Sequence, residues 1–505
     1  MDARGSWGFP RVRWSDDAAK AARQFEALEE VPSRTSAMLK RLIIRTSRIG
    51  LVAFLMLAVN FCYAGDSTKA ADEAAAVQWL QSSAHPFSTA SPTMEEMQPL
   101  VAALHGAEVI GIGEATHGSH EDESFKADLI KALILQGRVD VFFLEANRQI
   151  GADLDAYVTG QGGDLPTLLR SPSLFRNLRN EEFAGLILWI RAYNIQTNHP
   201  VHVVGIDCQD GGIDAEFALR FVKARDAKIA ARFDGAFTSL LAGAVRPRFA
   251  VWVATANASD YAKANEASRK LEQLFSAHQA TWSDKPGYAE AAYAAKTARQ
   301  AFDAFELDGG RGNPEKNGMA YYGRRDRYMA ANLLERLNGR TGVFWAHDMH
   351  VMADLPATDG WPSGFTWVGR EVHKVLGEQY QTVTFAWSKG SFLSQTQKGE
   401  QNFEVTHRKP MVPQTLPNDG PDDLGGVLIR TGFDGFWVDL RTLPVQPWAR
   451  RFASTNYARG WAGWRVDAKT WNKDVSDRAS LRPASDILVW FKQITPSHMF
   501  PGDDF

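Results

Sequence analysis

The chain has 505 residues, of which 45% are hydrophobic and 11% aromatic, so it can bury a large core and is not intrinsically disordered. Its formal net charge of -3 gives no electrostatic reason to expect a nucleic acid or another polyanion as a partner. The two cysteines, Cys62 and Cys208, are too few for a disulfide framework, and we expect Cys208 to be a small buried hydrophobic residue.

Residues 38–64 have the order of a secretory signal peptide. Basic residues follow Met38, an apolar stretch covers residues 49–61, and Cys62, Tyr63 and Ala64 then precede Gly65. The apolar stretch is shorter than the about 20 residues that a membrane span needs, so we expect cleavage after Ala64 and no stable membrane span afterwards. An uncleaved anchor is the alternative. The pattern predicts a periplasmic or secreted protein, with residues 1–37 as an upstream extension.

Short apolar runs rich in β-branched and aromatic residues alternate with segments of helical period. This alternation predicts an α/β fold with a central, mostly parallel sheet and flanking helices. The clearest expected strands are residues 109–113, 139–144, 201–206, 342–346 and 382–386. A helix with acidic residues in its first turn is expected after the first strand, and Gly137 is expected to stop it.

The region from residue 211 to residue 337 has a mainly helical, alanine-rich pattern without a convincing strand. It is too long for a simple crossover, so we expect a large helical insertion that covers the carboxyl edge of the strands, where a lid or substrate wall would lie. Strand patterns return at residue 342 and continue through residues 433–440. We therefore expect a catalytic domain over residues 65–443. Residues 444–505 show no clear period and are expected to form a C-terminal extension packed on that domain.

Four of the predicted strands end on an ionisable residue. These residues are Glu114, Glu145, Asp207 and His347. Ligands of open α/β sheets bind outside the carboxyl ends of the strands, because loops and helix N-termini converge there. We therefore expect these four residues to lie at one edge of the sheet and to form part of one site.

Several blocks of the sequence resemble the erythromycin esterase family, in the order expected for that family. The blocks are IGIGEATHGSHEDESFKADLI, FFLEAN, VVGIDCQ, RRDRYMAANL and FWAHDMHV, followed by WVGREVHKVLGEQYQTVTFAW and GFDGFWVDL. The resemblance covers roughly residues 76–443. It implies an esterase that hydrolyses a carboxylic ester or macrolactone with directly activated water instead of a serine acyl-enzyme. The absence of a GxSxG nucleophile elbow from the sequence agrees with this.

The resemblance also implies which residues carry the reaction. The family's catalytic histidine corresponds to His117, its two glutamates to Glu114 and Glu145, and its paired histidines to His347 and His350. Each of these residues also has a purely structural interpretation, such as a helix cap or a satisfied buried pair.

Two further residues are candidates for substrate binding. Lys126 corresponds to the family's basic residue in the first helix, where some members have arginine, and lysine lacks the two-pronged fork of arginine for a carboxylate. Asp207 could contact substrate or simply cap a loop. Asp348 occupies a position that is often asparagine in the family, and it adds a charge to the site. We expect His120 at the surface, and Arg325 and Asp326 as a structural ion pair on a helix.

The residue types agree with ester hydrolysis near neutral pH. Histidine is the natural general base there, because its ordinary pKa is about 6.5. Glu114 or Glu145 could fix the tautomer of the histidine and stabilise its protonated form. The histidines at 347 and 350 could donate hydrogen bonds to the developing oxyanion.

Two other functions stay open on the sequence alone. No cofactor is expected, but the Glu and His residues could instead bind Zn²⁺ or Mn²⁺, whose bound water would be the nucleophile. The same histidines could also bind haem or another ligand in a non-enzymatic periplasmic protein, although Glu114 and Glu145 beside them argue against that. The expected partner is a small-molecule ester or macrolide-like substrate, and the sequence specifies neither the natural substrate nor the oligomeric state.

Overall fold

The computed structural model describes residues 68–87, 92–171, 173–241, 249–307, 310–311, 318–356, 359–361, 364–396, 411–463, 465–473 and 477–500. The expected N-terminal extension and signal peptide, residues 1–64, lie outside the described residues. Residues 72–505 form one compact unit, which contains the elements named below. None of the described helices is both long enough and apolar enough to cross a membrane.

The main sheet is built from strands that are far apart in the chain. They are β1 (His85–Phe87), β2 (Val109–Ile112), β3 (Val141–Asn147), β4 (His202–Asp207), β7 (Gly342–Trp345), β8 (Tyr380–Gly390), β11 (Gly435–Asp439) and β15 (Ile487–Ile494). Their order in the described sheet is β1-β11-β15-β8-β2-β7-β3-β4. The six strands from β15 to β4 are parallel, and β11 runs antiparallel to both of its neighbours. This confirms the expected α/β fold, and all five predicted strands lie in this sheet.

Helices precede, connect and follow these strands. They are α3 (Met94–Ala103), α4 (His120–Leu135), α5 (Arg148–Val158), α6 (Leu165–Leu169), α7 (Glu181–Gln196), α8 (Gly211–Arg225), α9 (Ala227–Ala230), α10 (Thr238–Leu241), α11 (Phe249–Thr255), α12 (Ala258–Ala277), α13 (Gln279–Trp282), α14 (Tyr288–Phe305), α15 (Gly318–Leu337), α16 (Asp348–Val351), α17 (Val368–Leu376), α19 (Leu424–Leu428) and α20 (Pro447–Ser454). Short strands outside the main sheet are β5 (Glu306–Leu307), β6 (Gly310–Arg311), β9 (Phe392–Thr396), β10 (Val412–Gln414), β12 (Tyr457–Ala458), β13 (Arg465–Val466) and β14 (Arg478–Ala479).

Helices bury both faces of the parallel part of the sheet. Successive side chains of β3 alternate between two hydrophobic cores, as the two-residue period of a strand requires. Phe142 and Leu144 belong to the core that includes residues of α3, α4 and α7. Val141 and Phe143 belong to the core that includes Leu333 of α15 and residues of α17. Burial on both faces explains why these strands read as continuous apolar runs in the sequence.

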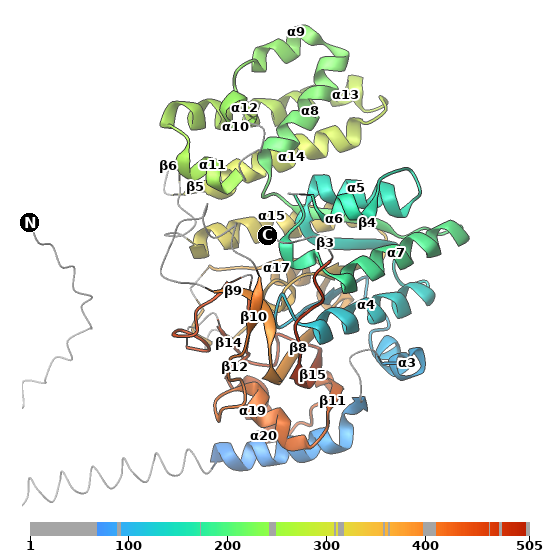
Figure 1. Cartoon of the computed structure of the whole chain (residues 1–505), viewed down its shortest axis with the longest axis vertical. Coiled ribbons are helices and arrows are strands. Elements are labelled where there is room, and N and C mark those ends of the chain that lie inside the picture. Colours follow the sequence, from blue (N-terminus) through green and yellow to red (C-terminus); the bar gives the residue numbers. More distant parts are fainter. Residues whose placement is uncertain are drawn as a thin grey trace, which may run out of the picture. The chain divides into compact units, whose positions relative to one another are not determined.

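The region expected as a helical insertion is helical where the structure describes it. Helices α8–α14 lie together at one end of this unit in Figure 1, and they share a hydrophobic core that includes Phe221, Trp252 and Phe302. Their connection to the sheet includes Tyr293 of α14, whose hydroxyl donates to the backbone oxygen of Gly205 in edge strand β4, at 3.2 Å. Helix α15, by contrast, packs on the sheet itself. Helix α15, the last helix of this region, therefore covers part of one face of the main sheet.

The C-terminal segment supplies a strand that the sequence did not reveal. Strand β15 lies between β11 and β8, with its first five residues buried. A short apolar run of this kind has no helical or alternating period, so it is hard to distinguish from a loop or a buried helix segment. The described part of the C-terminal segment therefore supplies a strand of the main sheet through residues 487–494.

The turn into α4 shows how local sequence places the candidate site. Ser119 caps α4 by accepting the backbone N–H of Asp122 at 3.2 Å, and acidic residues occupy the first turn. Gly137 follows the helix with a positive φ of 65°, as expected for a residue that stops a helix. At Gly113, a Cβ atom would lie 2.0 Å from Oδ1 of Asp348, so any other residue there would displace that carboxyl group.

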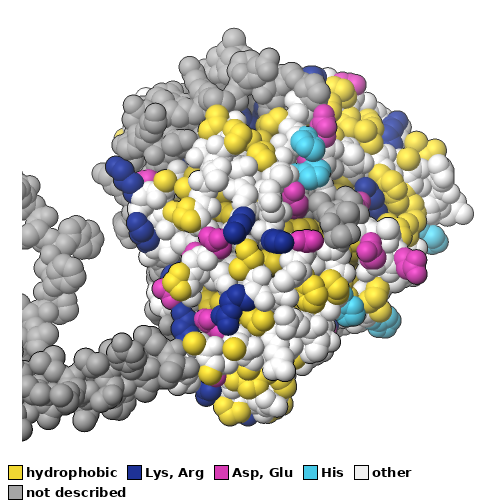
Figure 2. Space-filling view, turned by 60° about the horizontal axis from the view of Figure 1, so that its bottom comes forward, with side chains coloured by type: hydrophobic (Ala, Val, Ile, Leu, Met, Phe, Trp, Pro, Cys, Tyr) yellow, Lys and Arg dark blue, Asp and Glu magenta, His cyan; other side chains and the backbone are white. Residues whose placement is uncertain are grey.

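The surface of the molecule is mixed in character on the face drawn in Figure 2. Basic and acidic side chains are interspersed there with apolar ones over the described residues. The described part of this face therefore lacks the single-sign field that steers a polyanion onto a protein.

Candidate active site

The strand-end residues lie in two groups of ionisable side chains at the carboxyl edge of the sheet. The His117 cluster consists of Glu114, His117 and Lys126. The Arg325 cluster consists of Glu145, Asp207, Arg325, Asp326 and His350. His347 lies beside His117, with 5.0 Å between the ring centroids. The structure thus brings together the residues that the sequence placed at this edge.

In the His117 cluster, one carboxylate contacts a histidine ring and a lysine ammonium group. Oε1 of Glu114 lies 2.5 Å from Nδ1 of His117, and Oε2 accepts a hydrogen bond from the ammonium of Lys126. Glu114 and Lys126 are buried, whereas 13% of the His117 side chain is exposed. No described residue forms a hydrogen bond with Nε2 of His117. That nitrogen is therefore the one available for proton transfer.

The charges around Glu114 keep its carboxyl group ionised. Burial alone raises the pKa of Glu114, but the neighbouring charges and hydrogen bonds of Lys126 and His117 lower that pKa to about 2. An ionised carboxylate at Nδ1 favours the tautomer of His117 that carries its proton on Nδ1. The lone pair of a neutral His117 is then on Nε2, the position that a general base needs.

We expected Lys126 to bind substrate, but its position in the structure does not suit that role. Its side chain has no exposed surface, its ammonium group pairs with Glu114, and it lies 3.8 Å from the centre of the Trp345 ring. A fully enclosed ammonium cannot meet a substrate directly. In this structure Lys126 neutralises Glu114.

The Arg325 cluster is a continuous chain of charges. The guanidinium of Arg325 donates to both carboxylate oxygens of Asp207, at 3.0 and 2.6 Å, and to Oε1 of Glu145 at 2.9 Å. The His350 ring lies between two carboxylates, with Nδ1 at 2.7 Å from Asp326 and Nε2 at 3.2 Å from Glu145. Asp207 is fully buried, so it holds Arg325 in place and has no surface for a substrate.

This chain fixes the protonation states of Glu145 and His350. Burial lowers the pKa of His350, but the carboxylates of Asp326 and Glu145 raise it to about 10, so the ring is an imidazolium at neutral pH. Burial raises the pKa of Glu145, but His350 and Arg325 hold it well below its usual range. A carboxylate fixed in this way is a poor general base, which leaves that role to His117.

His347 is held neutral by burial and by backbone contacts. The pKa of His347 is lowered to about 3, mainly by burial and to a smaller extent by the electrostatic effect of His117. Nε2 lies 3.2 Å from the backbone oxygen of Ala115, and Nδ1 accepts the N–H of Met349 at 3.2 Å. With both nitrogens engaged, His347 has no N–H to offer an oxyanion in this arrangement. It instead connects the loop after β2 to the start of α16.

Two more carboxyl groups lie buried beside the His117 cluster. Oδ2 of Asp122 accepts the backbone N–H groups of Ala115 and Thr116, at 3.0 and 3.3 Å. Burial raises the pKa of Asp122 and of Glu123 well above the usual range, and the charge on Glu114 adds to both shifts. We infer that these two groups are protonated while Glu114 is ionised.

Asp348 lies behind the loop that carries His117. It accepts a hydrogen bond from the indole N–H of Trp461 at 3.0 Å and another from the backbone of Phe385. Burial raises the pKa of Asp348 to about 6, although Arg459 at 3.9 Å opposes this shift. The expected extra charge is therefore buried among structural partners.

The sequence did not predict several residues around the site. Arg325 and Asp326 were expected as an ion pair on a helix, but each bonds mainly to site residues from other elements. Their signal was their presence in the block RRDRYMAANL. Asn177, whose amide nitrogen lies 3.4 Å from Nδ1 of His117, and Trp461 carried no local signal, because only the tertiary fold brings them here. Cys208 is buried and unpaired, as expected.

The fold and this site define an α/β protein with a histidine–carboxylate pair suited to acid–base chemistry. The family model for erythromycin esterase matches residues 136–494, more than half of the chain, and the chain belongs to that family. Membership indicates a hydrolase of that kind. Glu114, His117 and Lys126 precede the matched residues.

Solved structures share the fold at low sequence identity. A protein from Bacillus cereus has a TM-score of 0.70 and 20% identity, covering 85% of this chain and 99% of its own. A succinoglycan biosynthesis protein has a TM-score of 0.67 and 18% identity, covering 84% and 97%. A mutant of the erythromycin esterase EreC in its open conformation has a TM-score of 0.61 and 16% identity, covering 81% and 96%. No curated protein matches the chain.

Proposed function

We propose that this protein hydrolyses a carboxylic ester or lactone with a water molecule that His117 activates directly. The observation that carries the proposal is the 2.5 Å contact between Nδ1 of His117 and the ionised carboxylate of Glu114. It sets the tautomer and stabilises the charge that the ring gains when it takes a proton. Family membership supports a hydrolase of this kind.

In the proposed reaction, Nε2 of His117 first accepts a proton and later donates it. The ring takes a proton from water as the water oxygen bonds to the ester carbonyl carbon, which leaves a tetrahedral oxyanion and an imidazolium. The oxyanion then collapses, the bond to the alcohol oxygen breaks, and the same Nε2–H protonates that oxygen. The products are the acid and the alcohol, and no side chain forms a covalent bond.

His350 supplies the positive charge for the oxyanion in this proposal. Its imidazolium is tied closely to Asp326 at 2.7 Å, whereas its contact with Glu145 is longer, at 3.2 Å. The Nε2–H group can therefore be shared with an oxyanion without loss of the stronger bond. Fixed charges of this type contribute strongly to acyl transfer because they need no reorganisation during the reaction.

The contacts of the paired histidines leave neither ring free to hold a catalytic metal or a haem without rearrangement. Both ring nitrogens of His350 contact carboxylates, at 2.7 Å from Asp326 and 3.2 Å from Glu145. His347 has a low pKa, but both of its nitrogens contact backbone groups. Direct activation of water by His117 needs neither group.

The substrate class is a small ester or lactone, with macrolides as one candidate. We also propose that the protein is exported to the periplasm or secreted, on the strength of the signal-like residues 38–64. A panel of macrolide lactones, simple esters and lactonised metabolites, incubated with the purified protein, should identify at least one compound that is hydrolysed. Hydrolysis of none of the ester or lactone classes would contradict the proposal.

The decisive experiment is rapid-quench turnover of the best substrate, followed by the mass of the intact protein. Direct attack by water predicts no acylated protein and no burst of alcohol. An acyl group that forms and decays at the rate of turnover, on any serine or on Cys208, would overturn the mechanism. Turnover in isotopically labelled water cannot distinguish the two mechanisms. Hydrolysis of an acyl-enzyme would also introduce an oxygen atom from water into the product acid.

A further inference from the structure

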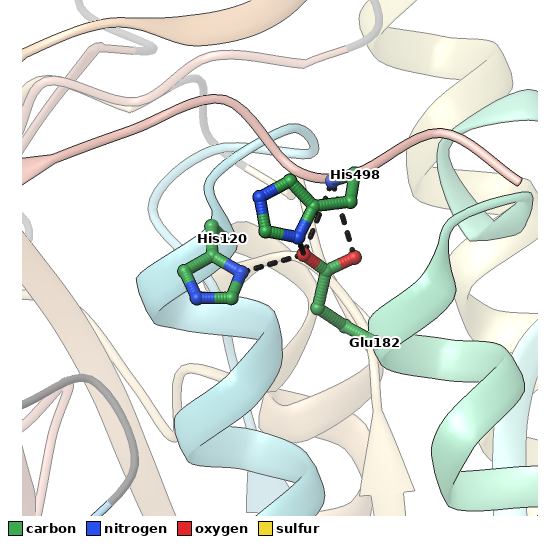
Figure 3. Close-up of side chains that lie close together, drawn as sticks. All are labelled: His120, Glu182 and His498. Carbon is green, nitrogen blue, oxygen red and sulfur yellow. Dashed lines mark hydrogen bonds and ion pairs between the residues drawn. The ribbon is translucent and has the colours of Figure 1, made fainter.

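A second histidine–carboxylate group lies outside the proposed active site. Figure 3 shows His120 from the start of α4, Glu182 from the first turn of α7 and His498 from the segment after β15, all pointing toward one another. One ligand atom of each lies within 4.8 Å of the others, and the described residues contain no other such group of His, Cys, Asp or Glu. Glu182 is buried, whereas His120 is partly exposed and His498 is exposed.

The spacing of these atoms is close to that of a metal coordination shell. Oε1 of Glu182 lies 2.6 Å from Nδ1 of His120 and 3.2 Å from Nδ1 of His498. Ligand atoms about 2.0–2.1 Å from a tetrahedral zinc ion lie roughly 3.3 Å from one another. A small outward movement of the His120 ring is therefore enough to admit an ion. The two rings, with centroids 4.5 Å apart, already face the same carboxylate.

Backbone contacts hold the three segments together before any ion binds. The N–H of His120 donates to the oxygen of Thr495 at 2.8 Å, and the N–H of Glu181 donates to the oxygen of His498 at 2.7 Å. The N–H of His498 also donates to both carboxylate oxygens of Glu182, at 3.1 and 3.3 Å. Because these contacts fix the chain locally, binding an ion would cost little additional ordering.

The local charge favours a cation. The charged neighbours that act on His120 are Glu182 and Glu121, and both are acidic. Glu121 is itself held in place, since its oxygens accept the backbone N–H and the hydroxyl of Thr495 at 2.6 and 2.8 Å. The positive end of a helix dipole would oppose a cation at the start of α4 and α7, but acidic residues in both first turns offset it.

We propose that His120, Glu182 and His498 form a binding site for a divalent transition-metal ion, with Zn²⁺ the best suited. Two imidazole nitrogens and one carboxylate oxygen suit zinc, whereas Ca²⁺ and Mg²⁺ prefer oxygen ligands alone. Water completes the coordination on the exposed side. The ion clamps the C-terminal segment to the loop that leads from His117 into α4, so its role is structural.

This site is independent of the proposed hydrolase. None of its three ligands belongs to the His117 cluster or to the Arg325 cluster. Metal binding can therefore be measured without a substrate, and its failure would leave the proposed reaction untouched.

The test uses the full chain without an affinity tag, stripped with a chelator and then equilibrated with Zn²⁺ or Co²⁺. We expect one zinc ion per chain after desalting, a visible Co²⁺ absorption band typical of nitrogen and oxygen ligands, and a higher unfolding midpoint with zinc. His498→Ala should weaken zinc binding at least about tenfold and remove the zinc-dependent rise in the midpoint. His199→Ala, at an exposed histidine elsewhere, is the matched control and should behave as the unchanged protein.

Glu182→Gln provides a second variant that keeps the size of the side chain but removes the carboxylate charge. It should also weaken zinc binding at least about tenfold, and circular dichroism without metal verifies that each variant is folded. Equal zinc affinity in the unchanged protein and in both folded ligand variants would overturn the proposal. The absence of bound zinc at micromolar concentrations in the unchanged protein would overturn it as well.

Discussion

Replacing Lys126 with methionine should separate the electrostatic support of the site from its chemistry. Lys126 and Glu114 are both buried, and they pair with each other. Methionine retains an unbranched apolar side chain against Trp345 but removes the charge. The variant leaves Glu114 as a buried carboxylate without its main partner, and breaking a buried pair in this way costs about 3–5 kcal/mol in the free energy of unfolding at pH 7.

The pKa of Glu114 gives a second measure of the expected loss in the free energy of unfolding. Its shift from the ordinary 4.5 to about 2 corresponds to about 3 kcal/mol, because one pKa unit is worth about 1.4 kcal/mol. Since the pKa is lower in the folded protein than in the unfolded chain, this stability is present above about pH 4.5. It is lost as the pH falls toward about 2. Without Lys126 that pKa rises, so the deficit of the variant should be largest near neutral pH and should shrink below about pH 4.5.

Urea unfolding followed by tryptophan fluorescence between pH 3 and pH 8 measures this deficit. Lys131→Met is the matched control, because Lys131 lies on the same helix and forms a partly exposed pair with Asp128 that should contribute less than about 1 kcal/mol. The double variant Lys126→Met/Glu114→Gln should recover most of the lost stability, because it no longer contains an unpaired buried carboxylate. It should lack activity, because His117 has lost its carboxylate partner. If Lys126→Met and Lys131→Met lost the same small amount of stability at pH 7, the assigned role of the buried pair would be wrong.

The remaining predictions concern the base, its neighbours and export. His117→Ala should lower kcat/KM by about 10²- to 10⁴-fold with little change in the thermal midpoint, and loss of activity through unfolding alone would contradict the role of general base. Glu123→Gln should retain activity because it replaces a protonated carboxyl, whereas Glu114→Gln should lose it; equal kinetic losses would refute the assigned protonation states. Protein recovered from a Gram-negative periplasm should begin at or within a few residues of Gly65 by N-terminal sequencing, and an intact initiator methionine would disprove cleavage.

The sequence predicted the strands whose signals are local. Strands β2, β3, β4, β7 and β8 are apolar runs separated by helical segments, and burial on both faces keeps those runs continuous. Strand β15 has an equally apolar start, but it follows a long segment rich in tryptophan, arginine and proline. Its partners β8 and β11 lie far back in the chain, so its place in the sheet depends on contacts that a local pattern does not contain.

The sequence predicted where the candidate site lies, but it did not predict the hydrogen bonds and ion pairs between the site residues. Glu114, Glu145 and His347 lie within two residues of the carboxyl ends of parallel strands, so their common edge follows from the topology of such sheets. Arg325 comes from a helix 118 residues beyond Asp207, and its contacts depend on how α15 packs over β3 and β4. The same reason explains His350, whose imidazolium state is set by Asp326 from that helix. Protonation states follow from tertiary contacts, which residue spacing does not specify.

Three of the buried carboxyl groups beneath the loop after β2, those of Glu114, Asp122 and Glu123, share the ammonium of Lys126 as a charged neighbour. A buried charge without a partner is costly, so one of the three can be ionised at low cost and the others are stable when protonated. Lys126 and His117 select Glu114, and the charge on Glu114 then raises the pKa of both remaining groups. The fold therefore reserves ionisation for the carboxylate that touches the catalytic candidate. The carboxylate that orients His117 in turn stays ionised because it pairs with Lys126, whose side chain has no exposed surface.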